Sequence, residues 1–367
     1  MGVDIGLAGF TVRALVLHLS KDTVESEVAL ETLMYRLLEA KDAVESSLNI
    51  RVDSLRVTAP SPGDPISVMD TVENVKPEDV IVSIGNLGSA RKSLEYEVKE
   101  AVSRGFYVGI LLEEPSWSHS RRLSKLVHEI AEESPDNAVR LGVNTLGSPI
   151  YTPYYPLSYS PGDGNSVTVA LTYPNYLKEA YQKGGFEGLK KAVEEAAAVA
   201  VEALNTAAAT VKAEPGGVDL SVAPWMEESS LGLAETIAGV RMPKPGFAIG
   251  VSLLNEALEI VASKVGAVGF NELQLPVAED SKLKARVSEG DTTARDLARL
   301  AGACLAGLDL AVVPADLEGV AGLILEVAAY SRSKRKPLGV RIIPLEGVGP
   351  GDKIQLARFG ETPVIPI

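Results

Sequence analysis

Four apolar segments in the second half of the chain each reach a proline and then acidic residues. They are DLSVAPWMEE at 219–228, FNELQLPVAED at 270–280, GLDLAVVPAD at 307–316 and VRIIPLE at 340–346. Proline has no N–H to donate to a neighbouring strand, so each segment is predicted to be a β-strand that ends at its proline. In parallel α/β sheets, ligands bind at the carboxyl ends of the strands. The candidate acid–base residues are therefore Asp219, Glu279, Asp280 and Asp316.

Asp280 and Asp316 are also candidate ligands for a divalent cation, because hard cations prefer carboxylate oxygens. The same acids have an ordinary structural interpretation. An aspartate that follows a strand is placed to cap the next helix and to face its positive end. Acid–base or cation chemistry requires several carboxyl groups to share one place, whereas capping uses each of them separately. Both interpretations stay open.

Charged residues also occur inside segments that are apolar enough to be buried strands. These residues are Arg13, Asp219, Glu272, Asp309 and Arg341. An unpaired buried charge is costly, so each requires a partner or a ligand. Side chains alternate along a strand, and if the faces of Asp219 and Arg341 point inward, these two residues are expected to meet inside the sheet. The alternatives are an internal ion pair and an anion-binding site in which Arg13 and Arg341 hold the ligand.

Two aromatic residues are candidates for ligand contacts. Trp225 follows Pro224 at the end of a predicted strand, where it is either a lid over a pocket or ordinary loop packing. Tyr154 belongs to LGSPIYTPYYPLSYSPGDGNS at 146–166, which has neither helical nor strand periodicity. This segment is either a linker or a loop folded into a pocket, and its four tyrosines favour packing. Long loops inside compact domains are often functional.

Motifs for transition metals are missing from the sequence, since it contains no HExxH, CxxC or DxDxDG pattern. His18, in a predicted central strand, is expected to be a packed, hydrogen-bonded side chain. The single cysteine, Cys304, excludes a disulfide within the chain and any multi-cysteine zinc or iron–sulfur site. We expect it to be a small buried residue of a helix. A divalent cation held by carboxylates leaves no strict motif and stays open as a cofactor.

The composition of the chain restricts the kinds of partner that it is expected to bind. The chain of 367 residues has a formal net charge of −14, which argues against binding to nucleic acid or to an anionic membrane surface. The amino-terminal residues match no secretory signal, and no uncharged apolar run reaches membrane-spanning length. These features predict a cytoplasmic protein. Scarce glutamine and numerous charges hint at thermostability.

Predicted strands and helices alternate along the chain. About five βα units precede the loop at 146–166, and about five more follow it, which predicts an α/β fold with parallel strand pairing and right-handed crossovers. An alanine-rich helix from Phe186 to about Lys212 is expected to lie between close neighbours. The predicted domain is a single unit over 1–367, with halves at about 1–145 and 167–367.

Several of these stretches resemble the PFL-family proteins, archaeal and bacterial proteins that carry domain of unknown function seven hundred and eleven. The matching segments are TPYYPLSY at 152–159, DLSVAPWMEESS at 219–230, LQLPVAED at 273–280, GLDLAVVPAD at 307–316 and KPLGVRIIPLEGVGPGD at 336–352. The resemblance spans most of the chain and is strongest after about residue 145. It implies the ten-stranded barrel of pyruvate formate-lyase and other glycyl radical enzymes, in which two parallel five-stranded half-sheets run antiparallel to one another.

The resemblance does not extend to radical chemistry. Glycyl radical enzymes use a glycine in a carboxy-terminal Arg-Val-x-Gly-Tyr-like loop and a cysteine at the tip of a finger. No glycine near the carboxyl end has that context, and Cys304 is predicted to lie on a helix. The family offers no reaction and no catalytic residue to carry over.

The sequence therefore leaves the reaction unknown and favours an enzyme that binds a small anionic metabolite, with or without a divalent cation, in the mouth of the barrel. A non-catalytic ligand-binding or regulatory protein is the alternative. A third hypothesis is a homo-oligomeric scaffold in which the alanine-rich helices form the subunit contacts.

Overall fold

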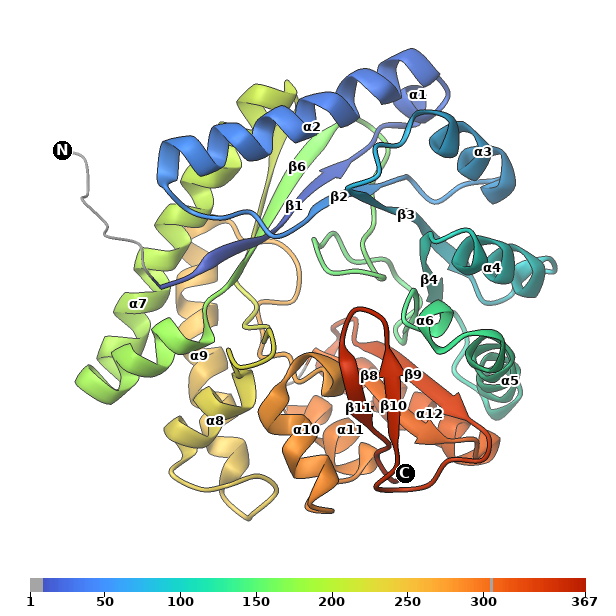
Figure 1. Ribbon diagram of the computed structural model, residues 1–367. Helices are drawn as coiled ribbons and strands as arrows, with labels where there is room; N and C mark the ends of the chain where they lie inside the picture. The colour runs from blue at the N-terminus through green and yellow to red at the C-terminus, as the bar shows by residue number, and fades with distance from the viewer. Residues whose placement is uncertain (1–8, 304–305) are drawn as a thin grey trace.

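The computed structural model describes residues 9–303 and 306–367, so Cys304 lies outside the described residues. Its main sheet has nine strands in the order β7-β6-β1-β2-β3-β4-β5-β9-β8. The strands are β1 (Thr11–His18), β2 (Leu55–Thr58), β3 (Val80–Gly88), β4 (Tyr107–Leu111), β5 (Leu141–Asn144), β6 (Ser166–Thr172), β7 (Glu214–Asp219), β8 (Gly307–Pro314) and β9 (Gly339–Leu345). Figure 1 shows them curving around the centre of the molecule, with the helices outside.

The sheet consists of two sets of strands that run in opposite directions. Strands β1 to β5 pair parallel to one another. Strand β6 is antiparallel to β1 and parallel to β7, while β9 is antiparallel to β5 and parallel to β8. The chain is therefore an α/β protein with a large, mostly parallel sheet, as its alternating pattern predicts.

The sequence predicts ten strands, whereas the sheet over the described residues has nine. The difference is the segment 270–275, which joins its neighbour through one isolated bridge between Val222 and Leu273. Side chains take several of its backbone donors: Phe270 N donates to Asp219 Oδ2 (3.2 Å) and Leu273 N to Asn255 Oδ1 (2.9 Å). Side chains that occupy these groups interrupt the regular ladder along this segment.

The helices cover the outside of the sheet. They are α1 (Lys21–Val24), α2 (Glu27–Leu48), α3 (Pro65–Val75), α4 (Leu94–Ser103), α5 (Trp117–Glu133), α6 (Pro135–Ala138), α7 (Pro174–Val211), α8 (Ser230–Ala238), α9 (Phe247–Val265), α10 (Ser281–Ser288), α11 (Ala294–Ala303) and α12 (Leu317–Lys334), with a short 3₁₀ turn, η1 (Val277–Glu279). Among the described residues no helix combines the length and the apolar character that crossing a membrane requires.

The alanine-rich helix α7 is buried within the chain. It packs against α2, α8 and α9 and against strands β6 and β7. Its small side chains, including Ala196, Ala200 and Ala203, are fully buried, which lets the neighbouring elements approach closely. The predicted close packing is confirmed. The suggestion that alanine-rich helices form subunit contacts stays a prediction, and the buried face of α7 is covered by the chain's own elements.

The long loop at 145–165, between β5 and β6, runs through the centre of the molecule (Figure 1). Residues 152–158 are all buried. Asn86 Nδ2 donates to Ser158 O (3.0 Å), and Tyr155 Oη donates to Val57 O (2.5 Å). Of the two alternatives left by the sequence, the loop is therefore folded into the interior, and its tyrosines fill the space that the strands enclose.

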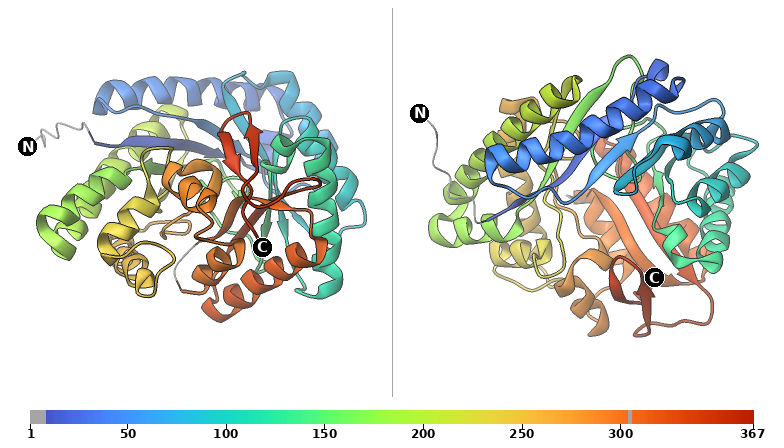
Figure 2. Two further views of the ribbon diagram at one scale, coloured as in Figure 1. Left: turned by 60° about the horizontal axis from the view of Figure 1, so that its bottom comes forward. Right: turned by 45° about the horizontal axis from the view of Figure 1, so that its top comes forward.

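A separate two-stranded hairpin, β10 (Lys353–Leu356) and β11 (Gly360–Pro363), stands against α10 and η1 (Figure 2). Its turn contains Arg358 and Phe359. The hairpin matters because this turn reaches the interior space described below.

Candidate functional site

A small cavity of about 40 Å³ lies inside the curved sheet, and we call it the inner chamber. The residues that line it are Arg13, Arg56, Ile81, Tyr107, Tyr154, Tyr155, Trp225, Glu279, Arg341, Arg358 and Phe359. Five residues singled out by the sequence meet there: Arg13, Tyr154, Trp225, Glu279 and Arg341.

The two halves of the chain supply opposite walls of the inner chamber. Arg13, Arg56, Ile81 and Tyr107 lie near the amino-terminal ends of β1, β2, β3 and β4. The second half contributes residues that follow its strands, Trp225 after β7 and Glu279 in η1, and the hairpin turn contributes Arg358 and Phe359. Because the halves run antiparallel, strand beginnings of one half face segments beyond the strand ends of the other.

Arg13 carries two buried guanidinium nitrogens, Nε and Nη2, that have no hydrogen-bond partner among the described residues. Buried donors are hydrogen-bonded in the great majority of cases, so an orphaned pair on one arginine requires an explanation. These nitrogens belong to a side chain that lines the chamber.

Arg56 is buried, with 8% of its surface exposed, and has no carboxylate partner among the described residues. Its Nε donates to Ser54 Oγ (3.0 Å) and its Nη1 to Pro153 O (3.3 Å). Burial, together with the charges of Arg13 and Arg358, lowers the pKa of Arg56 to about 10, so the group is still a cation at neutral pH. Its guanidinium carbon lies 5.2 Å from the ring centroid of Tyr155, which fixes its plane.

Arg358 enters from the hairpin turn. Its guanidinium carbon lies 5.4 Å from the ring centroid of Trp225, and that ring makes an edge contact with Phe359 at 6.2 Å between centroids. Arg13, Arg56 and Arg358 are together called the arginine cluster. None of the three forms an ion pair with a carboxylate in the part of the chain that the structure describes.

Arg341 differs from the arginine cluster, because a carboxylate neutralises it. Its Nε donates to Asp309 Oδ1 (2.6 Å) and its Nη2 to Asp309 Oδ2 (3.0 Å). Burial opposes the charged form of Arg341, but the Asp309 carboxylate raises its pKa above the ordinary value. Arg341 therefore forms an internal ion pair, but with Asp309, and its charge is neutralised within the chain.

The partner predicted for Arg341 was Asp219, and that prediction is wrong. Strands β8 and β9 are neighbours, and their register shifts between Leu308 and Ala311, where Leu310 has a φ of 49°. This bulge places Asp309 against Arg341. Regular alternation, which the prediction assumed, cannot anticipate a bulge.

Glu279 is the carboxyl group that lines the inner chamber. It is partly buried, at the end of the 270–280 segment. Desolvation raises its pKa above the ordinary value, although the charges of Arg341, Arg13 and Arg358 oppose the shift. A carboxyl group with a raised pKa inside a cavity is suited to give or take a proton near neutral pH.

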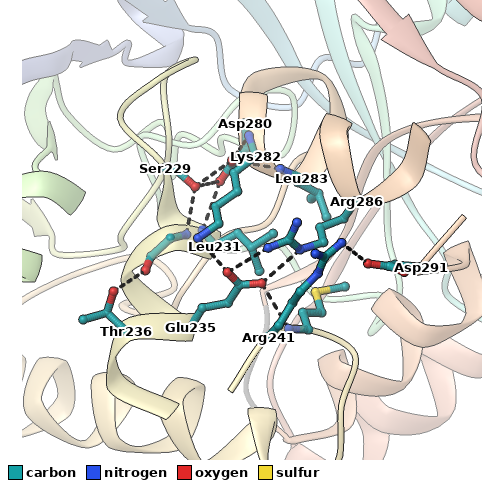
Figure 3. A network of polar contacts seen from close by, with 12 residues as sticks. Ser229, Leu231, Glu235, Thr236, Arg241, Asp280, Lys282, Leu283, Arg286 and Asp291 are labelled. Carbon is teal, nitrogen blue, oxygen red and sulfur yellow. Dashed lines mark hydrogen bonds and ion pairs between the residues drawn. The ribbon is translucent and has the colours of Figure 1, made fainter. Parts of the chain in front are cut away.

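Asp219 and Asp280 have structural partners outside the inner chamber. Asp219 accepts bonds from Thr152 Oγ1 (3.0 Å) and from the backbone N–H groups of Ser221 (2.9 Å) and Phe270 (3.2 Å), which ties β7 to the 270–275 segment. Asp280 caps α10, accepting from Lys282 N (2.9 Å), and also binds Leu231 N (3.0 Å) at the start of α8 (Figure 3).

Asp316 is exposed and caps α12 through the backbone N–H of Gly319 (2.9 Å). Asp280 and Asp316 thus cap different helices. The described residues contain no group of three or more His, Cys, Asp or Glu side chains placed to hold a metal ion. His18, as predicted, is packed: Nδ1 lies 2.9 Å from Tyr159 O and Nε2 lies 2.8 Å from Thr168 Oγ1.

Sequence reasoning missed two members of the arginine cluster. Arg56 lies in the apolar strand LRVT, so the rule that singled out Arg13 also applied to it. Arg358 lies in a hairpin turn and carries no such signal. Tyr155 and Phe359 also line the chamber without a sequence signal of their own.

A second space, the outer chamber, adjoins the first and shares Arg13, Trp225 and Arg358 with it. Its volume is about 580 Å³. The remaining lining residues are Lys41, Glu45, Arg51, Val52, Asp53 and Thr172. The Trp225–Arg358 stack therefore stands between a small interior space and a larger outer one.

The fold and the cavity define an α/β protein with a cationic interior chamber. Residues 116–357, well over half of the chain, match the family described as Uncharacterised ACR (DUF711), and the chain belongs to this family.

Similar curated proteins occur in archaea and bacteria. The chain is 35% identical over 164 residues to a UPF0210 protein of Methanopyrus kandleri, an alignment that covers 42% of this chain and 36% of that protein. It is 33% identical over 161 residues to a UPF0210 protein of Lactiplantibacillus plantarum, covering 41% of this chain and 36% of that protein. The chain thus aligns with little more than a third of the length of these relatives.

Proposed function

We propose that the protein is an enzyme that binds a small anionic metabolite in the inner chamber and uses Glu279 to transfer a proton. The observation that carries the proposal is the arginine cluster, three guanidinium groups that line one cavity of a chain with a net charge of −14 and that have no carboxylate partner among the described residues. Positive charges that repel one another cost folding free energy, and a bound anion would offset that cost.

The aromatic lining supports this role. Each of three guanidinium groups stacks on a ring: Arg56 on Tyr155, Arg358 on Trp225 and Arg341 on Tyr154. A stacked guanidinium keeps its plane and its N–H donors in a fixed direction, so less conformational entropy is lost when an anion binds. This pre-organisation favours a binding site over a purely structural arrangement.

Glu279 supports catalysis rather than binding alone. Its carboxyl group lines the chamber, and burial raises its pKa, which favours the protonated form that can donate a proton to a bound anion. A regulatory protein that senses the same ligand is the alternative. Turnover separates the two functions.

The test follows metabolites by NMR spectroscopy in a small-molecule extract to which purified protein is added. We expect the parent to consume the signals of an anionic metabolite and Glu279→Gln to retain binding while losing turnover. Equal consumption by both proteins would remove Glu279 from the mechanism. Retention of a metabolite by the parent without consumption would favour the sensor.

We also propose that the 270–275 segment acts as a tenth strand and closes the sheet into a barrel like that of pyruvate formate-lyase. In support, Gln274 N donates to Val222 O (2.9 Å) on one side, and Ala306 N donates to Leu273 O (3.4 Å) on the other. Amide hydrogen exchange tests this closure. We expect the Gln274 amide to be as protected as those of β8 and β9, and rapid exchange there would argue for an open sheet.

A further inference from the structure

The ligand has a shape that the two chambers define. The inner chamber, enclosed by aromatic rings and guanidinium groups, has a volume of about 40 Å³, whereas the outer chamber has about 580 Å³. The shared residues Arg13, Trp225 and Arg358 line both. A ligand with a compact anionic head and a larger body fits this pair of spaces, with the head inside and the body outside.

The free N–H donors of the arginine cluster indicate which kind of anionic group the inner chamber can hold. Arg13 has two buried nitrogens, Nε and Nη2, for which residues 9–303 and 306–367 offer no acceptor. Arg56 uses Nε and Nη1 for protein acceptors, which leaves Nη2 with no hydrogen bond among the described residues. Arg358 approaches from the hairpin on the far side, and its guanidinium stacks on Trp225 without a carboxylate partner among the described residues.

Three cations around one small space suit a group with three terminal oxygens and two negative charges. A carboxylate offers two oxygens and one charge, which one arginine fork satisfies. A phosphoryl group offers three oxygens and between one and two negative charges near neutral pH, and guanidinium forks match its geometry. Glu279, whose pKa burial raises, can add a donor instead of a competing charge.

The lining of the outer chamber indicates the chemistry of the remaining part of the ligand. It mixes cations with acids: Arg51 pairs with Asp53 (2.6 Å), and Glu45 Oε1 accepts from Val52 N (2.8 Å). Thr172 adds a hydroxyl group on the wall. Such a lining offers both donors and acceptors, which suits a polar, uncharged body that carries hydroxyl groups rather than an apolar tail or a second strong anion.

We infer that the ligand is a phosphate monoester with a polar body, its phosphoryl group held by Arg13, Arg56 and Arg358 in the inner chamber. This inference rests on the proposed anion-binding function and specifies its ligand class. It assigns no role to the Arg341–Asp309 pair in holding the phosphoryl group.

Titration calorimetry at constant ionic strength tests the inference with three probes: inorganic phosphate, glycerol 3-phosphate and succinate. We expect inorganic phosphate to bind the parent, glycerol 3-phosphate to bind more tightly, and succinate to bind at least about tenfold more weakly than inorganic phosphate. Arg56→Met and Arg358→Met should each weaken binding of inorganic phosphate about tenfold.

Two variants are used because replacement of a buried arginine can reduce binding simply by preventing correct folding. Arg56 is buried, whereas Arg358 is exposed in a hairpin turn, so its replacement should leave the fold intact. The matched control is Arg121→Met. Arg121 also stacks on a tryptophan, Trp117, at 5.4 Å, but it pairs with Glu318 and lines neither chamber. Its affinity for phosphate should equal that of the parent.

The outcomes separate the inference from the function it rests on. Tighter binding of succinate than of phosphate, still lost in Arg56→Met, would overturn the phosphoryl assignment and leave the anion site standing. Binding of no probe, or equal binding by the parent, Arg56→Met and Arg358→Met, would overturn both.

Discussion

Arg341 of β9 and Asp309 of β8 form a two-point ion pair in the interior, with Nε–Oδ1 and Nη2–Oδ2 distances of 2.6 Å and 3.0 Å. Their side chains are 5% and 12% exposed. The pair neutralises one arginine of the inner chamber, whereas the arginine cluster forms no ion pair with a carboxylate among the described residues. The predictions below follow from this difference between Arg341 and the three arginines of the cluster.

Breaking the Arg341–Asp309 pair should destabilise the fold. Asp309→Asn leaves the buried guanidinium without a counter-charge, and such a loss typically costs about 3–5 kcal/mol of unfolding free energy. Denaturant unfolding measures it. The control is Glu318→Ala, which removes the exposed pair with Arg121 and should cost less than about 1 kcal/mol. Equal effects of the two changes would contradict the structural role assigned to Asp309.

Asp280 and Asp316 should differ in their contribution to stability. Asp280 is buried between the starts of α8 and α10, whereas Asp316 is exposed at the start of α12. Asp280→Ala leaves donors of Ser229, Leu231, Lys282 and Leu283 unsatisfied, and we expect a loss of about 3 kcal/mol. Asp316→Ala should cost about 1 kcal/mol. Thermal and denaturant unfolding provide the comparison.

The variant Asp316→Asn tests the cation hypothesis. Calorimetry with Mg²⁺ and Mn²⁺ should give the same result for the parent and for Asp316→Asn, because the two acids cap different helices. A cation affinity that disappears in Asp316→Asn would restore a metal role for this residue.

His18 should make stability fall in mild acid. Burial lowers its pKa from 6.5 to about 3, so the folded chain keeps the imidazole neutral while the unfolded chain binds a proton below about pH 6.5. The unfolded state then binds more protons between these values, and unfolding free energy decreases as pH falls, by up to about 1.4 kcal/mol per pH unit for this group. In His18→Gln, the slope of the unfolding free energy against pH between pH 6 and pH 4 should fall. The decrease should correspond to about one proton fewer taken up on unfolding. An unchanged slope would place the proton uptake elsewhere.

Glu279→Gln should stabilise the protein at neutral pH while it removes turnover. Desolvation raises the pKa of Glu279, so the folded state disfavours its ionisation, and the parent loses stability as pH rises above the unfolded value of 4.5. The amide has no charge to desolvate. We expect a gain of up to about 1 kcal/mol at pH 7 that shrinks toward pH 4. Lower stability of the variant at pH 7 would show that the ionised carboxylate is stabilised in the fold.

The sequence allowed the fold class to be predicted because its periodic signals are local. Apolar strands that end at prolines and alternate with amphipathic helices predict an α/β sheet, and two sets of strands are present. Irregular geometry was harder to predict. The 270–275 segment reads as a strand, but side chains such as Asp219 and Asn255 occupy its backbone donors, and that is a tertiary effect.

Only part of the candidate site could be predicted, because only some of its residues carry a local signal in the sequence. Arg13 and Glu279 are conspicuous as charges in or beside apolar segments, and both line the inner chamber. Arg358 lies in an exposed turn, and its place in the cavity depends on where the hairpin docks. Asp280 and Asp316 look alike in the sequence, and only packing distinguishes a buried double cap from an exposed single one.

The most direct test of the arginine cluster is the thermal unfolding of the parent and of the double variant Arg13→Met/Arg56→Met across a series of small anions at fixed ionic strength. A ligand at about 100 times its dissociation constant adds about 2.7 kcal/mol to the unfolding free energy. We predict that anions raise the midpoint of the parent by several degrees and leave that of the double variant unchanged. Equal shifts in both proteins, or none in either, would contradict an anion site built on these arginines.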